Sequence, residues 1–372
     1  MSQVREKISN PPGPYLGLTE FKGLEDLVLG LRGRDWQKFG KRKRDDIVRR
    51  CLLYWRTRGF PYYELSNHEI IKEYQGLQRA NKERILSVDE IQMSMVGVKL
   101  ANYFHPQMWG VRVNGAHSPL DRFDSDEKLR LVIHRALTFY SDRSSVNECN
   151  LRRMLSIFSN TARVSNFRPT AAKAIFQEYS RDGDPVLDFS AGYGGRLLGC
   201  MVLNRHYIGI EPCRNQVQGL RQMVHTLNKL VEPNARVTIH QKCAEDFLPT
   251  IASNSIPLVF SSPPYFNNEL YSDETSQSYM RYPIYEEWIN CFLERILAES
   301  CRILKPGGHF VVNIADIERF ELTKDLVSLA RKYFTLDHTL RLRLGHKPYL
   351  RNRTGKVHKH EPVFVFRKVR RK

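Results

Sequence analysis

A proline-rich corner, Ser262-Pro263-Pro264-Tyr265, follows an apolar stretch that is typical of a buried strand. Neither proline has a backbone N–H to give to a strand ladder, so we expect the strand to end there in a rigid turn. The Ser262 hydroxyl and the Pro263 carbonyl then offer hydrogen-bond acceptors beside the flat ring of Tyr265. Such a set suits a planar ring with an exocyclic amine, because accepting the amine hydrogens makes the nitrogen a nucleophile. For this run taken alone, a purely structural turn is the alternative.

A glycine-rich run, DFSAGYGG, extends from Asp188 to Gly195 between a strand-like and a helix-like segment. Glycine allows positive φ and close approach of a ligand, and the start of the helix offers free N–H groups. Glu211 ends the next strand-like segment, 23 residues after Asp188. At about this offset an acid meets ribose hydroxyls in nucleoside-binding sheets. Because the loop lacks the dinucleotide pattern G-x-G-x-x-G, the sequence indicates a different nucleoside cofactor, with an ordinary turn as the alternative for the loop alone.

An acidic pair stands in the run CAEDF, at the end of the third strand-like segment. Asp246, slightly preferred to Glu245, could accept a hydrogen bond from an adenine amino group. An acid at a strand end is also a frequent helix cap, so both interpretations stay open.

Strand-like and helix-like segments alternate from about residue 165 to the end of the chain. This alternation predicts a mostly parallel sheet with helices on both faces. Ligands bind past the carboxyl ends of the strands in such sheets, which is where the three runs fall. Residues 15–154 instead show apolar positions at helical spacing and predict a mainly helical N-terminal domain, after a flexible lead-in of residues 1–14.

The glycine-rich run followed by the proline corner resembles the S-adenosylmethionine-dependent DNA amino-methyltransferases, which act on the exocyclic amine of cytosine or adenine. FRPTAAKAI is similar to the family segment before the glycine loop, LKPGGHFVV to its fifth strand, and HKHEPVFVFRK to its final hairpin strand. The resemblance covers roughly residues 155–372. It implies an α/β, Rossmann-like class I methyltransferase domain with a mostly parallel seven-stranded sheet, beside the mainly helical N-terminal region.

The resemblance also implies roles for individual residues. It assigns the cofactor to Thr170 at the carboxylate end, to Asp188, Ser190, Ala191, Gly192 and Gly194 along the methionine part, to Glu211 at the ribose and to Asp246 at the adenine amine. It assigns the target base to Ser262, Pro263, Pro264 and Tyr265. Ser190 departs from the family, which usually has a phenylalanine there to pack against the cofactor, whereas this chain has Phe189 beside it.

The implied activity is direct methyl transfer to a flipped-out DNA base, without a covalent enzyme intermediate. A serine before the two prolines usually accompanies cytosine N-4 as the target, which is therefore favoured. The alternatives are an adenine N-6 DNA methyltransferase, an RNA amino-methyltransferase, and a nucleic-acid-binding module whose methyltransferase half no longer works. We expect a monomer or homodimer, with a cognate restriction endonuclease as a candidate partner.

The charge of the chain favours a polyanionic partner, since the formal net charge is +18 and the sequence pI is about 9.6. From Arg341 to the end, twelve Lys and Arg residues stand against one acid. The candidates for nucleic-acid contact are Lys41, Arg42, Lys43, Arg44, Asn267, Lys347, Arg351 and Arg353. Further polar and aromatic residues of the loop 266–284 could read base edges or stack on bases: Asn268, Tyr271, Gln277 and Tyr279. A solvated helix face is the alternative for the basic run at residues 41–44.

The seven cysteines are scattered and form no Cys-x-x-Cys pair, which indicates thiols in a reducing compartment and no metal site. The N-terminus shows no apolar leader, and nowhere do eighteen apolar residues follow one another. We therefore expect a soluble, cytoplasmic protein.

Overall fold

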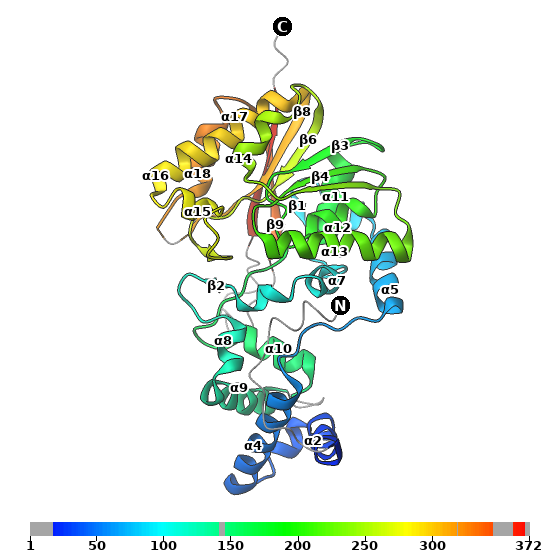
Figure 1. Cartoon of the computed structure of the whole chain (residues 1–372), viewed down its shortest axis with the longest axis vertical. Coiled ribbons are helices and arrows are strands. Elements are labelled where there is room, and N and C mark those ends of the chain that lie inside the picture. The colour runs from blue at the N-terminus through cyan, green and yellow to red at the C-terminus, as the bar shows by residue number, and fades with distance from the viewer. Residues whose placement is uncertain (1–17, 141–145, 318, 345–359, 369–372) are drawn as a thin grey trace. The chain divides into compact units, whose positions relative to one another are not determined.

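The computed structural model describes residues 18–140, 146–317, 319–344 and 360–368. The chain divides into two compact units (Figure 1). One unit, here called the helical unit, comprises residues 1–63 and 109–164. The other, here called the sheet unit, comprises residues 64–108 and 165–372.

The helical unit is held together by aromatic and aliphatic side chains. Its elements are α2 (Leu18–Gly30), α3 (Gly33–Trp36), α4 (Lys41–Arg58), β2 (Arg112–Val113), α8 (Pro119–Asp124), α9 (Asp126–Phe139) and α10 (Glu148–Ile157). Along α4, Ile47, Cys51 and Trp55 recur every four residues and are buried, as the helical periodicity of this segment predicts. Helices α2, α4, α9 and α10 pack against one another around them.

The sheet unit contains every strand of an eight-stranded sheet. Its first elements are α5 (Asn67–Gln78), α6 (Lys82–Ile85), β1 (Glu90–Ile91), α7 (Val98–Tyr103) and the 3-10 turn η1 (Pro106–Gly110), which ends across the boundary in sequence. The alternating part comprises α11 (Pro169–Tyr179), β3 (Pro185–Asp188), α12 (Gly195–Met201), β4 (His206–Ile210), α13 (Arg214–Val231), β5 (Arg236–His240), α14 (Ala244–Phe247), η2 (Leu248–Thr250), β6 (Ile256–Ser261), β7 (Glu269–Leu270), α15 (Ser278–Arg281), α16 (Tyr285–Glu287), the π-helical turn η3 (Trp288–Leu293), α17 (Glu294–Ile303), β8 (Leu304–Asn313), α18 (Leu322–Ala330), β9 (Thr335–Arg343) and β10 (His360–Arg367).

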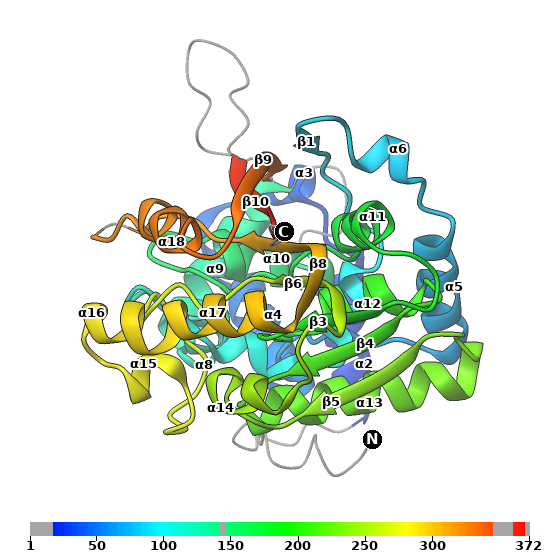
Figure 2. The ribbon, with the colours of Figure 1, turned by 90° about the horizontal axis from the view of Figure 1, so that it is seen from above.

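The strands run in the order β1-β9-β10-β8-β6-β3-β4-β5. Strand β10 pairs antiparallel with both β8 and β9, and the other neighbouring pairs are parallel. Helices α11, α12 and α13 lie on one side of the sheet, and α17 and α18 on the other (Figures 1 and 2). This order, with one antiparallel strand near an edge, is that of a Rossmann-like class I methyltransferase and confirms the predicted fold class.

Successive residues of the central strands face opposite cores, as a sheet covered on both sides requires. In β3, Val186 belongs to the core on the side of α11 to α13, and Leu187 to the core on the side of α17 and α18. In β6, Leu258 and Val259 divide in the same way. The strands are therefore continuous apolar runs whose carboxyl ends carry the polar residues.

The sheet has one strand more than the seven predicted. The additional strand, β1, has two residues and pairs parallel to β9 at the edge, with Ile91 opposite Leu342. A two-residue strand is too short to show a period-two pattern, so the sequence did not indicate it.

The predicted domain boundaries differ from the observed units. Residues 64–108, predicted to belong to an N-terminal domain, are part of the sheet unit, and its second segment begins at 165 rather than 155. Tyr74 in α5 is buried and donates a hydrogen bond of 2.6 Å to the Met201 carbonyl. Helical periodicity shows which face of a segment is buried but not which core it joins. Residues 1–14, predicted as a lead-in, lie outside the described residues.

None of the seven cysteines, all of them in described segments, forms a disulfide, and they differ in exposure: Cys51, Cys200 and Cys213 are buried, whereas Cys149 and Cys291 are exposed. Across the described segments, no helix has the length and apolar character needed to cross a membrane.

Candidate active site

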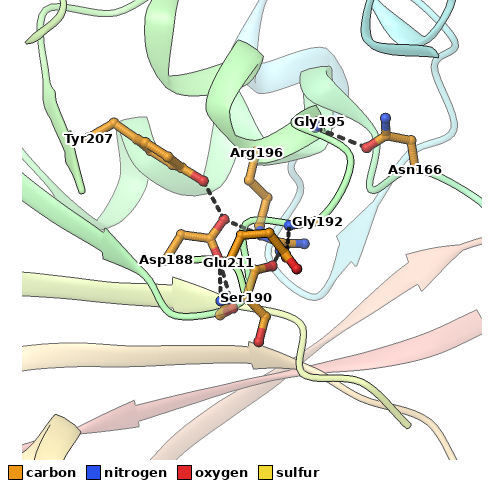
Figure 3. A network of polar contacts seen from close by, with 9 residues as sticks. Asn166, Asp188, Ser190, Gly192, Gly195, Arg196, Tyr207 and Glu211 are labelled. Carbon is orange, nitrogen blue, oxygen red and sulfur yellow. Dashed lines mark hydrogen bonds and ion pairs between the residues drawn. The ribbon is translucent and has the colours of Figure 1, made fainter. Parts of the chain in front are cut away.

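Asp188, the last residue of β3, is fully buried at the centre of a polar network (Figure 3). Its Oδ2 accepts hydrogen bonds from the Tyr207 hydroxyl at 2.6 Å and from Arg196 Nε at 2.7 Å. Its Oδ1 accepts from the Ser261 hydroxyl at 2.7 Å and from the Ser190 N–H at 3.3 Å. The Asp188 carboxylate is thus occupied by groups of the protein, and its predicted place along the methionine part of the cofactor stays a prediction.

The hydrogen bond between Asp188 and Ser261 joins the glycine loop to the proline corner. Ser261 is the last residue of β6 and immediately precedes Ser262. Asp188 and Ser261 are 73 residues apart along the chain, yet this 2.7 Å bond brings the two runs together at the carboxyl ends of neighbouring strands. The glycine loop and the proline corner therefore lie next to each other at the carboxyl ends of β3 and β6.

The glycine loop adopts a backbone that side chains would disturb. Gly192 has φ +57° and Gly194 has φ +77°, both in the left-handed region that favours glycine. A Cβ at Gly195 would overlap the Phe167 carbonyl, so the loop lies directly against the segment that precedes α11. Asn166 fixes this contact, because its Oδ1 accepts from the Gly195 N–H at 2.9 Å and its amide donates to the Tyr193 carbonyl at 2.8 Å.

Glu211 follows β4 directly and faces the glycine loop (Figure 3). Its carboxylate accepts from the Gly192 N–H at 2.9 Å and from the Cys213 N–H at 3.0 Å. The side chain amide of Gln216 also donates to it once the amide is placed in its better-bonded orientation. Burial raises the pKa of Glu211 to about 7, although the two backbone N–H groups act in the opposite direction.

The other predicted cofactor residues have different surroundings. Ala191 is buried and Ser190 is half-buried, with its carbonyl accepting from Arg196. Thr170 is 1% exposed and its hydroxyl donates to the Ser94 carbonyl at 3.4 Å, and its contact with the carboxylate end of the cofactor stays a prediction. Phe189 does not replace the missing phenylalanine at position 190, because it points to the opposite face of the sheet and stacks on Phe310.

Asp246 lies in α14, directly after β5, and its carboxylate is about half exposed. It does not cap the helix, since the N-cap residue is Cys243 and no side chain bonds the helix start. Both oxygens instead contact Arg281, with the shorter distance at 2.7 Å. The neighbouring Glu245 is buried and accepts from the same guanidinium at 2.7 Å.

The proline corner begins where it was predicted, because β6 ends at Ser261. Pro263 is buried, whereas Ser262, Pro264 and Tyr265 are half-buried. The hydroxyl of Tyr265 donates to Asn313 Oδ1 at 3.4 Å, and the Asn313 amide donates to the Pro362 carbonyl at 3.0 Å. Asn313 ends β8, so the orientation of Tyr265 is set by the neighbouring strand.

Phe266 follows the corner with φ +49°, a left-handed conformation that is uncommon for a residue with a bulky side chain. The ring is buried among Tyr285, Trp288 and Phe320, with centroid distances of 5.4 to 5.9 Å. This packing compensates for the backbone strain, which is of the order of 1–3 kcal/mol at such sites. The corner is therefore held in an unfavourable local conformation by the core beneath it.

The predicted nucleic-acid residues are distributed over the whole chain. Lys41 and Arg42 are exposed in the first turn of α4, whereas Lys43 lies over the Phe39 ring and Arg44 donates to the carbonyls of Trp36 and Gln37. In the loop after the corner, Asn267 is exposed, whereas Gln277 and Tyr279 are buried. Lys347, Arg351 and Arg353 lie outside the described residues.

Several residues of the site were not predicted from the sequence. They include Asn166, Arg196, Tyr207, Ser261, Arg281 and Asn313. Arg196 had a usable signal, since a charged residue inside the apolar helical run RLLGCMVL needs a buried partner. For the others, the partner is too distant in sequence for a spacing argument.

Known proteins share parts of this chain. Residues 256–372 match a family described as DNA methylase (N6_N4_Mtase). Over 83 residues the chain is 35% identical to the Type II methyltransferase M.BglI of Bacillus subtilis, which corresponds to 22% of this chain and 21% of that relative. The chain thus matches about a fifth of the length of this curated relative.

Solved structures with similarity to the chain include methyltransferases of different kinds. TrmN from Thermus thermophilus aligns with 54% of this chain and 49% of its own, with 15% identity and a TM-score of 0.37. A SAM-dependent O-methyltransferase from Thermotoga maritima aligns with 56% of this chain and 69% of its own, with 14% identity and a TM-score of 0.37. At this similarity, no ligand or substrate of theirs is transferred to this chain.

The family match includes the proline corner and the strands β6, β8, β9 and β10 that surround it. It confirms the expected cofactor, S-adenosylmethionine. Residues 256–372 of the chain are thus similar to the DNA methylase family of amino-methyltransferases.

Proposed function

We propose that the protein is a DNA methyltransferase that transfers the methyl group of S-adenosylmethionine to the exocyclic amine of a flipped-out base, with cytosine N-4 as the target. The observation that carries the proposal is the hydrogen bond between Asp188 and Ser261, because it holds the glycine loop beside the proline corner. The matched DNA methylase family supports the reaction class.

The residues around the glycine loop fit a nucleoside cofactor. A Cβ at Gly192 would meet only the Ser190 carbonyl oxygen, at 3.7 Å, so the backbone borders open space. The Glu211 carboxylate beside it accepts from the Gly192 and Cys213 N–H groups and from the Gln216 amide, and a ribose hydroxyl would take the place of that amide. Glu211 would accept the ribose hydroxyls and Asp246 the adenine amine. The cofactor, when bound, supplies an activated methyl group.

The protein's own residues would prepare the target nitrogen. The Ser262 hydroxyl and the Pro263 carbonyl accept the amine hydrogens, and the half-buried Tyr265 ring provides a face for stacking. Both acceptors sit on a corner whose φ angles are fixed by proline, so little entropy is lost when a base is aligned. A stacked base cannot reach this corner, and extruding it costs a few kcal/mol, offset by the stacking and by basic contacts to the backbone.

The choice of cytosine as the target base depends on the serine at position 262. Adenine N-6 is the second candidate, because the matched family is named for both amines. A third candidate, RNA, is tested by offering labelled S-adenosylmethionine with duplex DNA, tRNA or rRNA. Transfer to duplex DNA in preference to both RNAs is expected. Preferential labelling of either RNA would contradict the proposal. The cytoplasm, a restriction partner and a monomer or homodimer remain predictions from the sequence.

The affinity for S-adenosylmethionine should depend on pH through Glu211. Burial raises its pKa to about 7, with Asp188 acting in the same direction and Arg196 against it. Ribose hydroxyls donate to the ionised carboxylate, so binding releases a proton and the Kd should rise as the pH falls below about 7, approaching tenfold per pH unit. Calorimetric titration between pH 5.5 and 8.5 measures this. Glu211→Gln should bind weakly at every pH with a flat profile. A flat profile in the unaltered protein would show that Glu211 does not hold the ribose.

Lys41 and Arg42 are proposed to contact DNA phosphates. Four basic residues occupy the first turn of α4, which contains no acid, so their charges oppose the helix dipole and do not stabilise the helix. In Lys41→Ala/Arg42→Ala, we expect weaker DNA binding and a slope of log K against log salt that is smaller by about 1 to 2. The matched control is Lys324→Ala/Lys332→Ala, whose ammonium groups are paired with Glu321 and Glu294. Equal slopes for both double variants would argue against phosphate contact at α4.

A further inference from the structure

The segment after the proline corner extends from the end of β6 to the residues that follow β4 and β5, where the cofactor is proposed to bind. Residues 272–281, here called the strap, are bonded to the turn after β4 and to the turn after β5. At the first, the Glu274 carboxylate accepts from the Arg214 N–H at 3.1 Å and from the Cys213 thiol at 3.6 Å. At the second, the Ser276 carbonyl accepts from the Cys243 thiol at 3.4 Å. The strap thus joins the two turns that carry Glu211 and Asp246.

Arg281, at the end of the strap, makes the strongest of these attachments. Its Nη1 lies 2.7 Å from Glu245 Oε1 and 2.7 Å from Asp246 Oδ2, and its Nη2 lies 3.4 Å from Asp246 Oδ1. The Glu245 side chain is 2% exposed, that of Asp246 is 48% exposed, and that of Arg281 is 28% exposed. One guanidinium therefore bridges a buried acid and an acid that is open to a ligand.

We propose that Arg281 is a positioning residue for the cofactor: it holds Asp246 in the orientation that receives the adenine amine, and it makes the strap a part of the cofactor site. The inference rests on the proposed function, because it takes Asp246 as the acceptor of the adenine amine. Nothing in the strap's sequence indicates this role, since the segment follows the target-base corner and was predicted to read DNA.

Arg281 could instead block Asp246, and the charges argue against this. A carboxylate has about four lone-pair sites, and the guanidinium of Arg281 uses one on each oxygen of Asp246, so that one on each oxygen is left for a ligand. Displacing Arg281 would leave the buried Glu245 without its cation, which is costly for a charge at this depth. The arrangement is therefore more stable if Arg281 stays in place while the exposed side of Asp246 binds the cofactor.

A consequence follows for the target base. The strap begins seven residues after Tyr265, which is proposed to bind the target base, and it ends at Arg281, which bonds Asp246 of the proposed cofactor site. An ordered strap therefore connects the site for the base with the site for the cofactor. Buried Gln277 and Tyr279 help to fix the middle of the strap, and Trp288 Nε1 donates to the Ser278 hydroxyl at 3.2 Å. Cofactor binding and target-base binding should therefore favour each other, with loss of Arg281 weakening both the affinity and this coupling.

The test is calorimetric titration of the full chain with S-adenosylmethionine in the absence of DNA. In Arg281→Ala the Kd should rise about tenfold, and in Arg281→Lys by less, because an ammonium keeps the charge but not the planar fork. Arg341→Ala is the matched control, since Arg341 pairs with Asp89 through side chains that are both more than half exposed. Its Kd should equal that of the unaltered protein.

A double-variant cycle separates positioning from general structural support. If Arg281 acts through Asp246, Arg281→Ala should change the Kd by less than about twofold when Asp246→Asn is already present. Three results would overturn the inference: an unchanged Kd in Arg281→Ala, a lower Kd, which indicates blocking, or an equal loss in both backgrounds. If the unaltered protein itself binds no S-adenosylmethionine, the proposed function fails, and the inference with it.

Discussion

Ser262→Ala should lower kcat by about 10²- to 10³-fold and leave the Kd for S-adenosylmethionine within about threefold of the unaltered value. The hydroxyl is proposed to accept a hydrogen from the target amine, and groups that act on the reacting atom in this way contribute factors of this size. The cofactor is assigned to the turns after β3, β4 and β5, whereas Ser262 follows β6. Single-turnover transfer of a labelled methyl group and calorimetric titration measure the two quantities separately.

The matched control for Ser262→Ala is Ser255→Ala, in the turn before β6. The Ser255 hydroxyl is exposed and donates to the Ala252 carbonyl, so its loss should leave kcat unchanged. Tyr265→Phe keeps the ring and removes the hydroxyl, with its 3.4 Å hydrogen bond to Asn313 and its interactions with Ser262 and Glu361, and it should retain far more activity than Tyr265→Ala. Full methylation by Ser262→Ala would refute the role of the corner.

Asp188→Ala should destabilise the protein by about 3–5 kcal/mol, the usual cost of removing one partner of a buried ion pair. The substitution leaves the buried guanidinium of Arg196 without its carboxylate, and the hydroxyls of Tyr207 and Ser261 without their acceptor. Because Ser261 precedes the corner, kcat should fall even under conditions in which the variant is folded. Urea unfolding followed by circular dichroism measures the loss of stability.

A control for Asp188→Ala is Asp89→Ala, which breaks the exposed ion pair with Arg341 and should cost less than about 1 kcal/mol. Asp188→Asn keeps the shape of the side chain and part of its acceptor capacity. Its loss of unfolding free energy should therefore lie between those of Asp188→Ala and Asp89→Ala. Equal unfolding midpoints for Asp188→Ala and Asp89→Ala would show that the Asp188 network does not stabilise the carboxyl ends of the central strands.

The sequence carried enough information to predict the layers of the sheet unit and where its site lies. Apolar strands alternate with amphipathic helices, and each strand end has its own local signal: glycines after Asp188, an acid at Glu211 and two prolines after Ser262. Parallel strands bring their carboxyl ends to one edge, so local signals alone place these residues together. Predicting that these residues lie together therefore does not require knowledge of contacts between distant segments.

The contacts between these residues could not be predicted, because each joins segments that are distant in sequence. Asp188 was predicted to line the cofactor, but its partners Arg196, Tyr207 and Ser261 were not predicted. The bond between Asp246 and Arg281, 35 residues later, also has no local signal in the sequence. The left-handed conformation of Phe266 is likewise imposed by the core beneath it, since its own residue type disfavours such a backbone.

The assignment of residues 64–108 failed for a related reason. Their helices were predicted, but α5 and β1 complete the sheet unit through Tyr74 and Ile91, and apolar periodicity does not identify the surface that covers a helix. The division of such a chain into units depends on contacts of high sequence separation, which a single sequence does not reveal.

Identification of the methylated nucleoside tests the central claim most directly. Duplex DNA is incubated with the protein and S-adenosylmethionine that carries a deuterated methyl group, digested to nucleosides and separated by mass. The account predicts deuterated N4-methyldeoxycytidine, which the Ser262→Ala variant does not produce. Deuterium on N6-methyldeoxyadenosine would show that adenine is the target base and would leave the proposed role of the proline corner intact. Deuterium on a ring carbon, or none in DNA at all, would contradict transfer to an exocyclic amine.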